Sequence, residues 1–272
     1  MEFRGKAKKL DDIDLPKIGR LIGVGEDELH AVLDVETRGG GFFKDGRLKM
    51  LPERHVFYRE LGHGPERDAA VRRGLAYKRW GTKKYPKSSE ARYKLLAEMM
   101  SINEDAALRS VSWGLGQIMG FNHRLAGYPS AKAMVEAFVD DEETHLRAMV
   151  KFIVSAGLDD ELRSHDWSGF ARGYNGSGYA KHGYHTKLAA AFKKWRAIPD
   201  TPFEIDRVDP EGVTDTAKVK AKQRAREGAG AGLIIVATAA ANWWDEIKEA
   251  VTAKACAIQV INDFFCAGGL NL

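Results

Sequence analysis

Cysteine is scarce in this chain, and its scarcity argues against several classes of protein. Only Cys256 and Cys266 occur among 272 residues, and both lie near the C-terminus. Two late cysteines cannot build a disulfide scaffold, and they form neither a C-x-x-C motif nor a zinc-ligand spacing. His182 and His185 lie three residues apart, but no acidic or cysteine partner accompanies them. We therefore expect neither a metal nor another cofactor.

The N-terminal segment lacks a long apolar run. Residues 1–12, MEFRGKAKKLDD, carry basic side chains with no apolar core after them, so no secretory signal is predicted and we expect a cytoplasmic protein. Gly114 and Gly116 are followed by a third glycine at position 120, and no valine-rich strand precedes them, which argues against a dinucleotide-binding loop. An internal repeat is also lacking.

Positive charge is unevenly distributed along the chain. The net charge is +4 and the pI about 8.9, but residues 200–272 hold 8 Lys and Arg against 11 Asp and Glu. The first 199 residues therefore hold 34 against 27, a net charge of +7. A basic front domain suggests an anionic partner, either a nucleic acid or a cell-wall polymer.

Composition divides the chain into three parts. Residues 1–198 are expected to form one domain, and residues 199–227 a proline-rich linker with a basic helix-like stretch. Residues 228–272 form an expected apolar helical tail. Within it, residues 228–244 carry no charge and end in a tryptophan pair, which is the lower limit for a membrane span with an aromatic interface. The alternative is a buried Ala/Gly-rich helix.

Apolar residues recur at helical spacing through most of the first 198 residues. Leu146, Met149 and Ile153, for example, share one helix face and are expected in the core. Residues 41–53 differ, because aromatic and aliphatic side chains flank a Lys-Asp-Gly turn, which predicts a short β-hairpin. The predicted fold class is therefore mainly α (α+β). The expected helical stretches are 14–23, 26–37, 89–111, 130–157, 159–175 and 184–198.

The stretch AVLDVETRGGGFF, residues 31–43, carries the sharpest functional signal. Leu29, Val32, Leu33 and Glu36 fall at i, i+3, i+4 and i+7 of a helix, which places a carboxyl group on an apolar face. Loss of hydration raises the pKa of a carboxyl group, and a general acid then keeps its proton near neutral pH. The glycines that follow end the helix and leave space for a bulky ligand. The alternative is a last-turn glutamate turned toward solvent.

Two further carboxylates compete for a second catalytic role. Glycoside hydrolysis commonly uses two carboxyl groups that face each other across the sugar. Asp45 lies nine residues after Glu36 at the tip of the expected hairpin, although Asp-Gly is also ordinary turn chemistry. Glu53 is the runner-up, but the adjacent Arg54 suits a structural ion pair equally well.

Two glycine-rich segments supply candidate binding residues. Residues 110–122, SVSWGLGQIMGFN, are expected to form a turn that opens a cleft-lining helix, with a glutamine as a bidentate hydrogen-bonding group. Residues 170–185, FARGYNGSGYAKHGYH, interleave tyrosines with glycines and an asparagine, which suits a sugar, although a structural loop could have the same composition. The candidate substrate-binding residues are Gln117, Asn122, Tyr174, Asn175 and Tyr179.

In their order along the chain, three segments resemble the N-acetylmuramidase family of bacteriophage endolysins. They are AVLDVETRGGGFFKDGRLKMLPERHVFYREL, SVSWGLGQIMGFNH and DWSGFARGYNGSGYAKHGYHTKLAAAF, and the resemblance runs from about residue 10 to 196. More distantly, the arrangement is similar to goose-type lysozymes and soluble lytic transglycosylases. The resemblance implies a lysozyme-like fold with the hairpin beside the active-site cleft.

The resemblance also implies cleavage of the β-1,4 bond between N-acetylmuramic acid and N-acetylglucosamine in peptidoglycan. On that basis Glu36 matches the catalytic glutamate that protonates the glycosidic oxygen, and Gln117, Tyr174 and Asn175 match cleft-lining positions. Asp45 has a spacing similar to that of the second acid in related phage lysozymes, whereas transglycosylases use the glutamate alone. Such a lysin is expected to be a monomer that collects in the host bacterial cytoplasm and reaches the wall at lysis. Residues 228–244 could hold it at the inner membrane.

Two other functions compete with hydrolysis. A lytic transglycosylase would use the muramic 6-hydroxyl in place of water and would leave 1,6-anhydro ends. A helix-turn-helix DNA-binding protein would match the helix, glycine turn and helix of residues 10–33. However, the second helix carries five acidic residues, which would face phosphates badly. We therefore expect no nucleic-acid partner.

Overall fold

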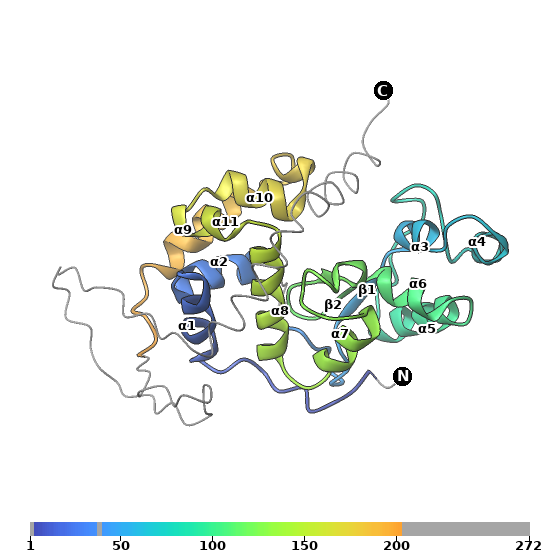
Figure 1. Cartoon of the computed structure of the whole chain (residues 1–272), viewed down its shortest axis with the longest axis horizontal. Coiled ribbons are helices and arrows are strands. Elements are labelled where there is room, and N and C mark those ends of the chain that lie inside the picture. Colours follow the sequence, from blue (N-terminus) through green and yellow to red (C-terminus); the bar gives the residue numbers. More distant parts are fainter. Residues whose placement is uncertain (1–2, 37–39, 203–272) are drawn as a thin grey trace.

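The computed structural model describes residues 3–36 and 40–202, so the predicted apolar tail and nearly all of the predicted linker lie outside the described residues. Figure 1 shows two groups of helices on either side of α8 (Glu142–Ser155), and one of the groups contains a small sheet. The mainly α fold with a small β element is the one that the sequence predicted.

The first group holds the N-terminal helices together with the last three helices of the described chain. Its members are α1 (Asp14–Gly19), the 3-10 helix η1 (Arg20–Ile22), α2 (Glu26–Glu36), α9 (Asp159–Ser164), α10 (Trp167–Asn175), the 3-10 helix η3 (Ser177–Tyr179) and α11 (Tyr184–Trp195). Chain segments far apart in sequence therefore meet here. In particular, α2 packs along α11.

The second group surrounds the sheet. Its members are β1 (Met50–Pro52), α3 (Arg54–Glu60), α4 (Pro65–Arg72), α5 (Ser89–Met100), α6 (Glu104–Arg109), β2 (Val111–Trp113), β3 (Ile118–Met119), the 3-10 helix η2 (Gly120–Asn122) and α7 (Ala131–Phe138). The sheet is antiparallel in the order β1-β2-β3, with Met50 opposite Trp113 and Ser112 opposite Met119.

Three of the long helical stretches expected from sequence are each broken into two helices. The breaks fall at Asn103, Asp141 and Asp166, and each side chain accepts a hydrogen bond from the backbone N–H three residues later, at 2.9, 2.6 and 2.9 Å. A side-chain oxygen at this position satisfies one of the free N–H groups of a helix start. Apolar periodicity runs across such breaks, which is why it gave longer helices.

The predicted hairpin at residues 41–53 is present. Phe42 and Leu48 form an antiparallel bridge, and the Phe43 N–H donates to the Arg47 carbonyl oxygen at 2.8 Å. The expectation that residues 110–122 open a helix was wrong, because they form a second hairpin, β2–β3, and then η2. Gly114 at φ +68° and Gln117 at φ +48° make the turn between the two strands, which leaves the flanking apolar residues free to pair.

The core confirms the apolar stripes that the sequence predicted. Leu29 and Val32 are fully buried on α2, as are Leu146 and Met149 on α8. The helix α2 packs against both α1 and α11. Within the described ranges, no helix combines the length and apolarity needed to cross a bilayer. The predicted membrane segment, residues 228–244, lies outside them.

Candidate active site

Glu36 is the last residue of α2, and its carboxyl group is half-buried. Asn175, at the end of α10, donates a hydrogen bond from Nδ2 to Glu36 Oε1 at 3.0 Å. Burial raises the pKa of Glu36 to about 6, and the Asn175 hydrogen bond and the Lys187 ammonium oppose this rise only in part. A carboxyl group with this pKa is half-protonated near pH 6, as a general acid requires. The alternative of a glutamate turned toward solvent is therefore wrong.

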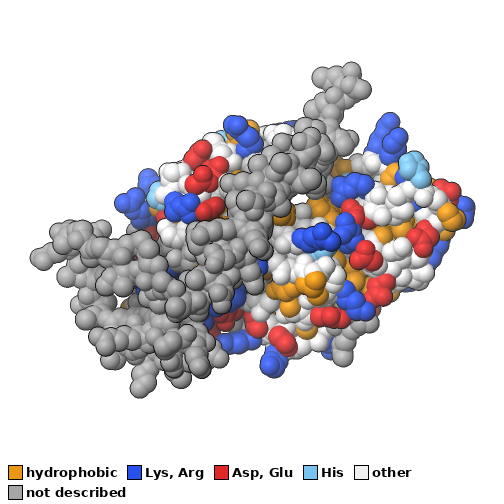
Figure 2. Space-filling view, viewed as in Figure 1, with side chains coloured by type: hydrophobic (Ala, Val, Ile, Leu, Met, Phe, Trp, Pro, Cys, Tyr) orange, Lys and Arg blue, Asp and Glu red, His pale blue; other side chains and the backbone are white. Residues whose placement is uncertain are grey.

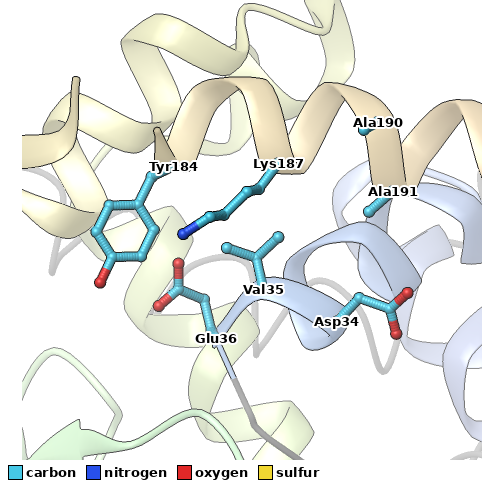
Figure 3. Close-up of a pocket in the computed structure, with 7 residues that line it drawn as sticks. All are labelled: Asp34, Val35, Glu36, Tyr184, Lys187, Ala190 and Ala191. Atoms are coloured by element: carbon cyan, nitrogen blue, oxygen red, sulfur yellow. The ribbon is translucent and has the colours of Figure 1, made fainter. Parts of the chain in front are cut away.

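A pocket of about 500 Å³ opens beside Glu36 between α2 and α11. Figure 3 shows the Lys187 ammonium pointing toward the Glu36 carboxylate, with the Tyr184 ring beside it. The residues that line the pocket are Asp34, Val35, Glu36, Tyr184, Lys187, Ala190 and Ala191. The pocket therefore presents two acids, Asp34 and Glu36, and the cation of Lys187 beside small apolar side chains.

Tyr174 links this end of α10 to the sheet. Its ring stacks on Phe170 and meets Phe152 edge to face, and its hydroxyl donates to the Gly116 carbonyl oxygen at 3.4 Å. Burial raises the pKa of Tyr174, so the phenol stays protonated and remains a hydrogen-bond donor. The neighbouring Asn175 is thereby held in place to contact Glu36. Asn175 Oδ1 is buried and has no hydrogen-bond partner among the described residues.

The glycines after Glu36 have a different role from the one predicted. Gly39 lies outside the described residues, but Gly41 is buried, and a Cβ atom on it would collide with the His145 ring. The space beside Gly41 is therefore filled by α8 and not reserved for a ligand. The Gly41 N–H donates to Glu142 Oε1 at 2.6 Å, which fixes the chain just beyond Glu36.

Comparison with known proteins identifies the family. A model of the N-acetylmuramidase family matches residues 26–196, more than half of the chain. The chain belongs to the N-acetylmuramidase family. A crystal structure of the endolysin of Burkholderia phage AP3 is 35% identical over 70% of this chain and 72% of that one, with a TM-score of 0.62. No curated protein matches the chain significantly. The two matches make this muramidase a peptidoglycan-degrading enzyme of the endolysin type.

In this muramidase, Asp45 is an exposed residue of the first hairpin turn. Its carboxylate accepts hydrogen bonds from the Arg47 Nε at 2.8 Å and from the Arg47 backbone N–H at 3.1 Å. These hydrogen bonds and the guanidinium charge lower the pKa of Asp45. Arg47 also pairs with Glu90 and lies over the Tyr93 ring, so its hold on Asp45 is itself fixed. The contacts of the Asp45 side chain are with Arg47 and not with Glu36, and its catalytic role stays a prediction.

Glu53 lies where β1 passes into α3, with its side chain largely buried. The Tyr85 hydroxyl donates to its carboxylate, at 2.7 Å from Oε2 and 3.0 Å from Oε1, and His55 Nδ1 lies 3.3 Å from Oε2. The ion pair with Arg54 that the sequence allowed is replaced by a hydrogen bond from Arg54 to the Lys84 carbonyl oxygen at 3.4 Å. Glu53 is thus held in place by Tyr85 and His55.

The second hairpin of the muramidase connects these two regions. Ser112 Oγ lies 3.1 Å from Gln117 Oε1 and 3.5 Å from the Leu51 carbonyl oxygen, and Gln117 Nε2 donates to the Gly114 carbonyl oxygen at 2.8 Å. The predicted binding residue Gln117 therefore uses both ends of its amide within its own hairpin. Contacts run without a break from β1, near Glu53, to β2–β3 and on to Tyr174.

The other two predicted binding residues, Asn122 and Tyr179, contact residues other than Glu36. Asn122 ends η2, and its carbonyl oxygen accepts a hydrogen bond from the Ala126 N–H at 3.1 Å. Tyr179 in η3 contacts the Arg172 guanidinium and the His185 ring, with centroid distances of 5.8 and 5.3 Å. Their roles in binding stay predictions. In the described part of the chain, no three His, Cys, Asp or Glu residues cluster as metal ligands.

Sequence reasoning missed Lys187 and Tyr184. Their spacing with Ala191, at i, i+3 and i+7, places all three on one face of α11, the face that packs on α2. The sequence alone could have shown that a lysine lies on this face. It could not have shown that the lysine lies near Glu36, because that depends on the packing of helices about 150 residues apart in sequence.

Proposed function

We propose that this muramidase cleaves the β-1,4 bond between N-acetylmuramic acid and N-acetylglucosamine, with Glu36 as the general acid. The observation that carries the proposal is the half-buried Glu36 carboxyl group, with a pKa of about 6, held by Asn175 at the edge of a pocket. As a phage endolysin, the enzyme would act on the host wall from the cytoplasm at lysis. The family match and the endolysin structure support this assignment.

The hydrogen bond from Asn175 determines where the catalytic proton lies. Because Asn175 Nδ2 donates to Glu36 Oε1, the acidic proton belongs on Oε2, which faces away from the amide. Transfer of that proton to the glycosidic oxygen lets the leaving sugar depart as an alcohol. The carboxylate left behind is then favoured by the nearby Lys187 charge and by the Asn175 hydrogen bond.

The mass of the products decides between hydrolysis and transglycosylation. We expect the enzyme to release muropeptides from purified peptidoglycan with reducing muramic ends, because a second carboxyl group is available to activate water. A lytic transglycosylase would release 1,6-anhydro ends, which weigh one water less. Mass spectrometry after borohydride treatment separates the two, since only reducing ends gain hydrogen. A product pool made entirely of anhydro ends would replace hydrolysis by transglycosylation.

Glu53 is the stronger candidate for the group that activates water. We expect Glu53→Gln to lower the rate of peptidoglycan cleavage by about 100-fold, the lower end of the usual range for a general base. Asp45→Asn should leave the rate within about twofold, because Asp45 is exposed and held by Arg47. Both changes keep the size of the side chain, so initial rates on purified sacculi can be compared directly. The reverse order of effects would return the role to Asp45.

A further inference from the structure

The loop between α4 and α5, with the last turn of α4, carries charge of one sign. Seven Lys and Arg residues and no Asp or Glu occur from residue 69 to residue 89. All seven are exposed, and we call this region the cationic loop surface. It lies beside α3 and α4, at the end of the molecule away from α9–α11, where Figure 2 shows Lys and Arg side chains projecting. This stretch alone carries as much positive charge as the net +7 of residues 1–199.

Contacts from the inside of the loop hold its backbone in place. The Arg92 Nε donates to the Pro86 carbonyl oxygen at 3.1 Å, and an Arg54 N–H donates to the Lys84 carbonyl oxygen at 3.4 Å. Leu75 and Ala76 are buried below the loop, and the Tyr77 hydroxyl bonds back to a backbone carbonyl oxygen at 2.8 Å. The loop is therefore a built structure that presents its charges outward.

Trp80 is the most exposed large apolar side chain of the described residues, at 70% exposure. Its position is nevertheless fixed, because Trp80 Nε1 donates to the Tyr85 hydroxyl at 2.9 Å and Tyr85 in turn donates to Glu53. One edge of the indole is thus bound and its faces are open. An open, fixed aromatic ring is suited to stacking on the C–H face of a sugar.

The chain of hydrogen bonds from Trp80 ends at Glu53, so the cationic loop surface adjoins the candidate active site. Glu53 follows β1, which contacts the second hairpin, and that hairpin contacts Tyr174 beside the residue that binds Glu36. A polymer that extends from the Glu36 pocket along these elements would pass onto the loop.

We propose that the cationic loop surface binds the peptide-bearing glycan strand at a distance from Glu36. Trp80 stacks on a sugar, and the lysines pair with the carboxylates of the stem peptides. The proposal rests on the proposed function for the identity of the polymer. A lipid surface fits less well, because only Val71 and Trp80 expose large apolar side chains here, too few for insertion into a bilayer.

The test measures binding separately from cleavage, with the full-length chain carrying Glu36→Gln. Proteins are pelleted with purified sacculi and with the same sacculi after an amidase has removed the stem peptides. The surface variant adds Lys78→Gln, Lys83→Gln and Lys84→Gln. The matched control adds Lys6→Gln, Arg124→Gln and Lys193→Gln, which remove equal charge from exposed positions elsewhere. A third protein adds Trp80→Ala.

We expect the surface variant to bind peptide-bearing sacculi about tenfold more weakly at low salt and to bind peptide-free glycan as its parent does. The control should bind peptide-bearing and peptide-free sacculi within about twofold of its parent. Trp80→Ala should bind both kinds of sacculi more weakly. Equal binding of the surface variant and the control to peptide-bearing sacculi would overturn the proposal. The same proteins are also pelleted with vesicles of anionic phospholipid. If the surface variant lost binding to the vesicles but not to sacculi, the surface would be assigned to a membrane and the proposal would be overturned. Product masses from the enzyme with Glu36 intact test the proposed function independently.

Discussion

Glu36→Gln should lower the rate of peptidoglycan cleavage by about 10²- to 10⁴-fold, the contribution typical of a general acid. Glutamine keeps the size of the side chain and can still accept the hydrogen bond from Asn175, so fold and substrate binding should be retained. In the wild type, the rate should fall as pH rises through about 6, because Glu36 then loses its proton. Muropeptide release from purified sacculi measures both effects.

Glu36→Gln should also raise the free energy of unfolding, by an amount that depends on pH. The folded pKa of about 6 lies above the usual 4.5, so burial penalises the ionised form. Below pH 4.5 the carboxyl group is protonated in both states and has no such effect. Above pH 6 it is ionised in both, and the penalty is fully present, at about 2 kcal/mol. Urea unfolding of Glu36→Gln and wild type should therefore differ by about 1–2 kcal/mol at pH 7.5 and converge near pH 4.

Glu136→Gln, the same chemical change on an exposed position of α7, serves as the control and should alter neither rate nor stability measurably. Substantial residual cleavage by Glu36→Gln would remove the assignment of Glu36 as the acid. Loss of cleavage together with loss of binding to sacculi would instead indicate a damaged site.

Glu142→Ala should cost about 3–5 kcal/mol of unfolding free energy, the largest stability loss that we expect from removing one charge. Glu142 is buried at 4% exposure and accepts from the Gly41 N–H at 2.6 Å, the Leu10 N–H at 3.2 Å and the Lys9 ammonium at 2.8 Å. Alanine would leave these donors without their acceptor. Because Gly41 follows Glu36 closely in the chain, the rate of cleavage should fall as well.

Glu143→Ala is the matched control for that experiment. Glu143 is the next residue of α8, but it lies near the surface and pairs with Lys17 and Arg147, so its removal should cost about 1 kcal/mol or less. Urea unfolding at pH 7 compares the two. Burial opposes ionisation of Glu142, but its three donors prevail and lower its pKa, so the stability it provides should be lost as pH falls below 4.5. Equal losses for the two variants would contradict a special role for Glu142.

Local patterns predicted the elements of this fold well, and long-range contacts account for what they missed. The stripe of Leu29, Val32 and Glu36 could be read directly, because residues of one helix face recur at fixed spacing. By contrast, the ring of His145 against Gly41 joins residues about 100 positions apart, so the glycine looked like space for a ligand. The second hairpin was misread because its turn uses a left-handed Gln117, a conformation that composition does not reveal.

In the candidate site, too, local patterns predicted some residues, and contacts between side chains decided the rest. Glu36 could be found from its face of the helix and from the order of three segments, whereas Asp45 was favoured on sequence spacing alone. Spacing could not show that Arg47, two residues away, holds the Asp45 carboxylate at the surface, nor that Tyr85 holds Glu53. These partners come from side-chain directions, which a linear pattern leaves open.

Glu36 is the final residue of an eleven-residue helix, so its carboxyl group lies at the negative pole of the α2 dipole. The last carbonyl groups of α2 point the same way as the acid and disfavour a second negative charge beside them. The helix dipole therefore acts in the same direction as burial, which raises the pKa of the Glu36 carboxyl group. Substitution of Ala190 or Ala191 would therefore reshape the pocket without removing a charge from the acid, whereas substitution of Lys187 would also change the Glu36 pKa.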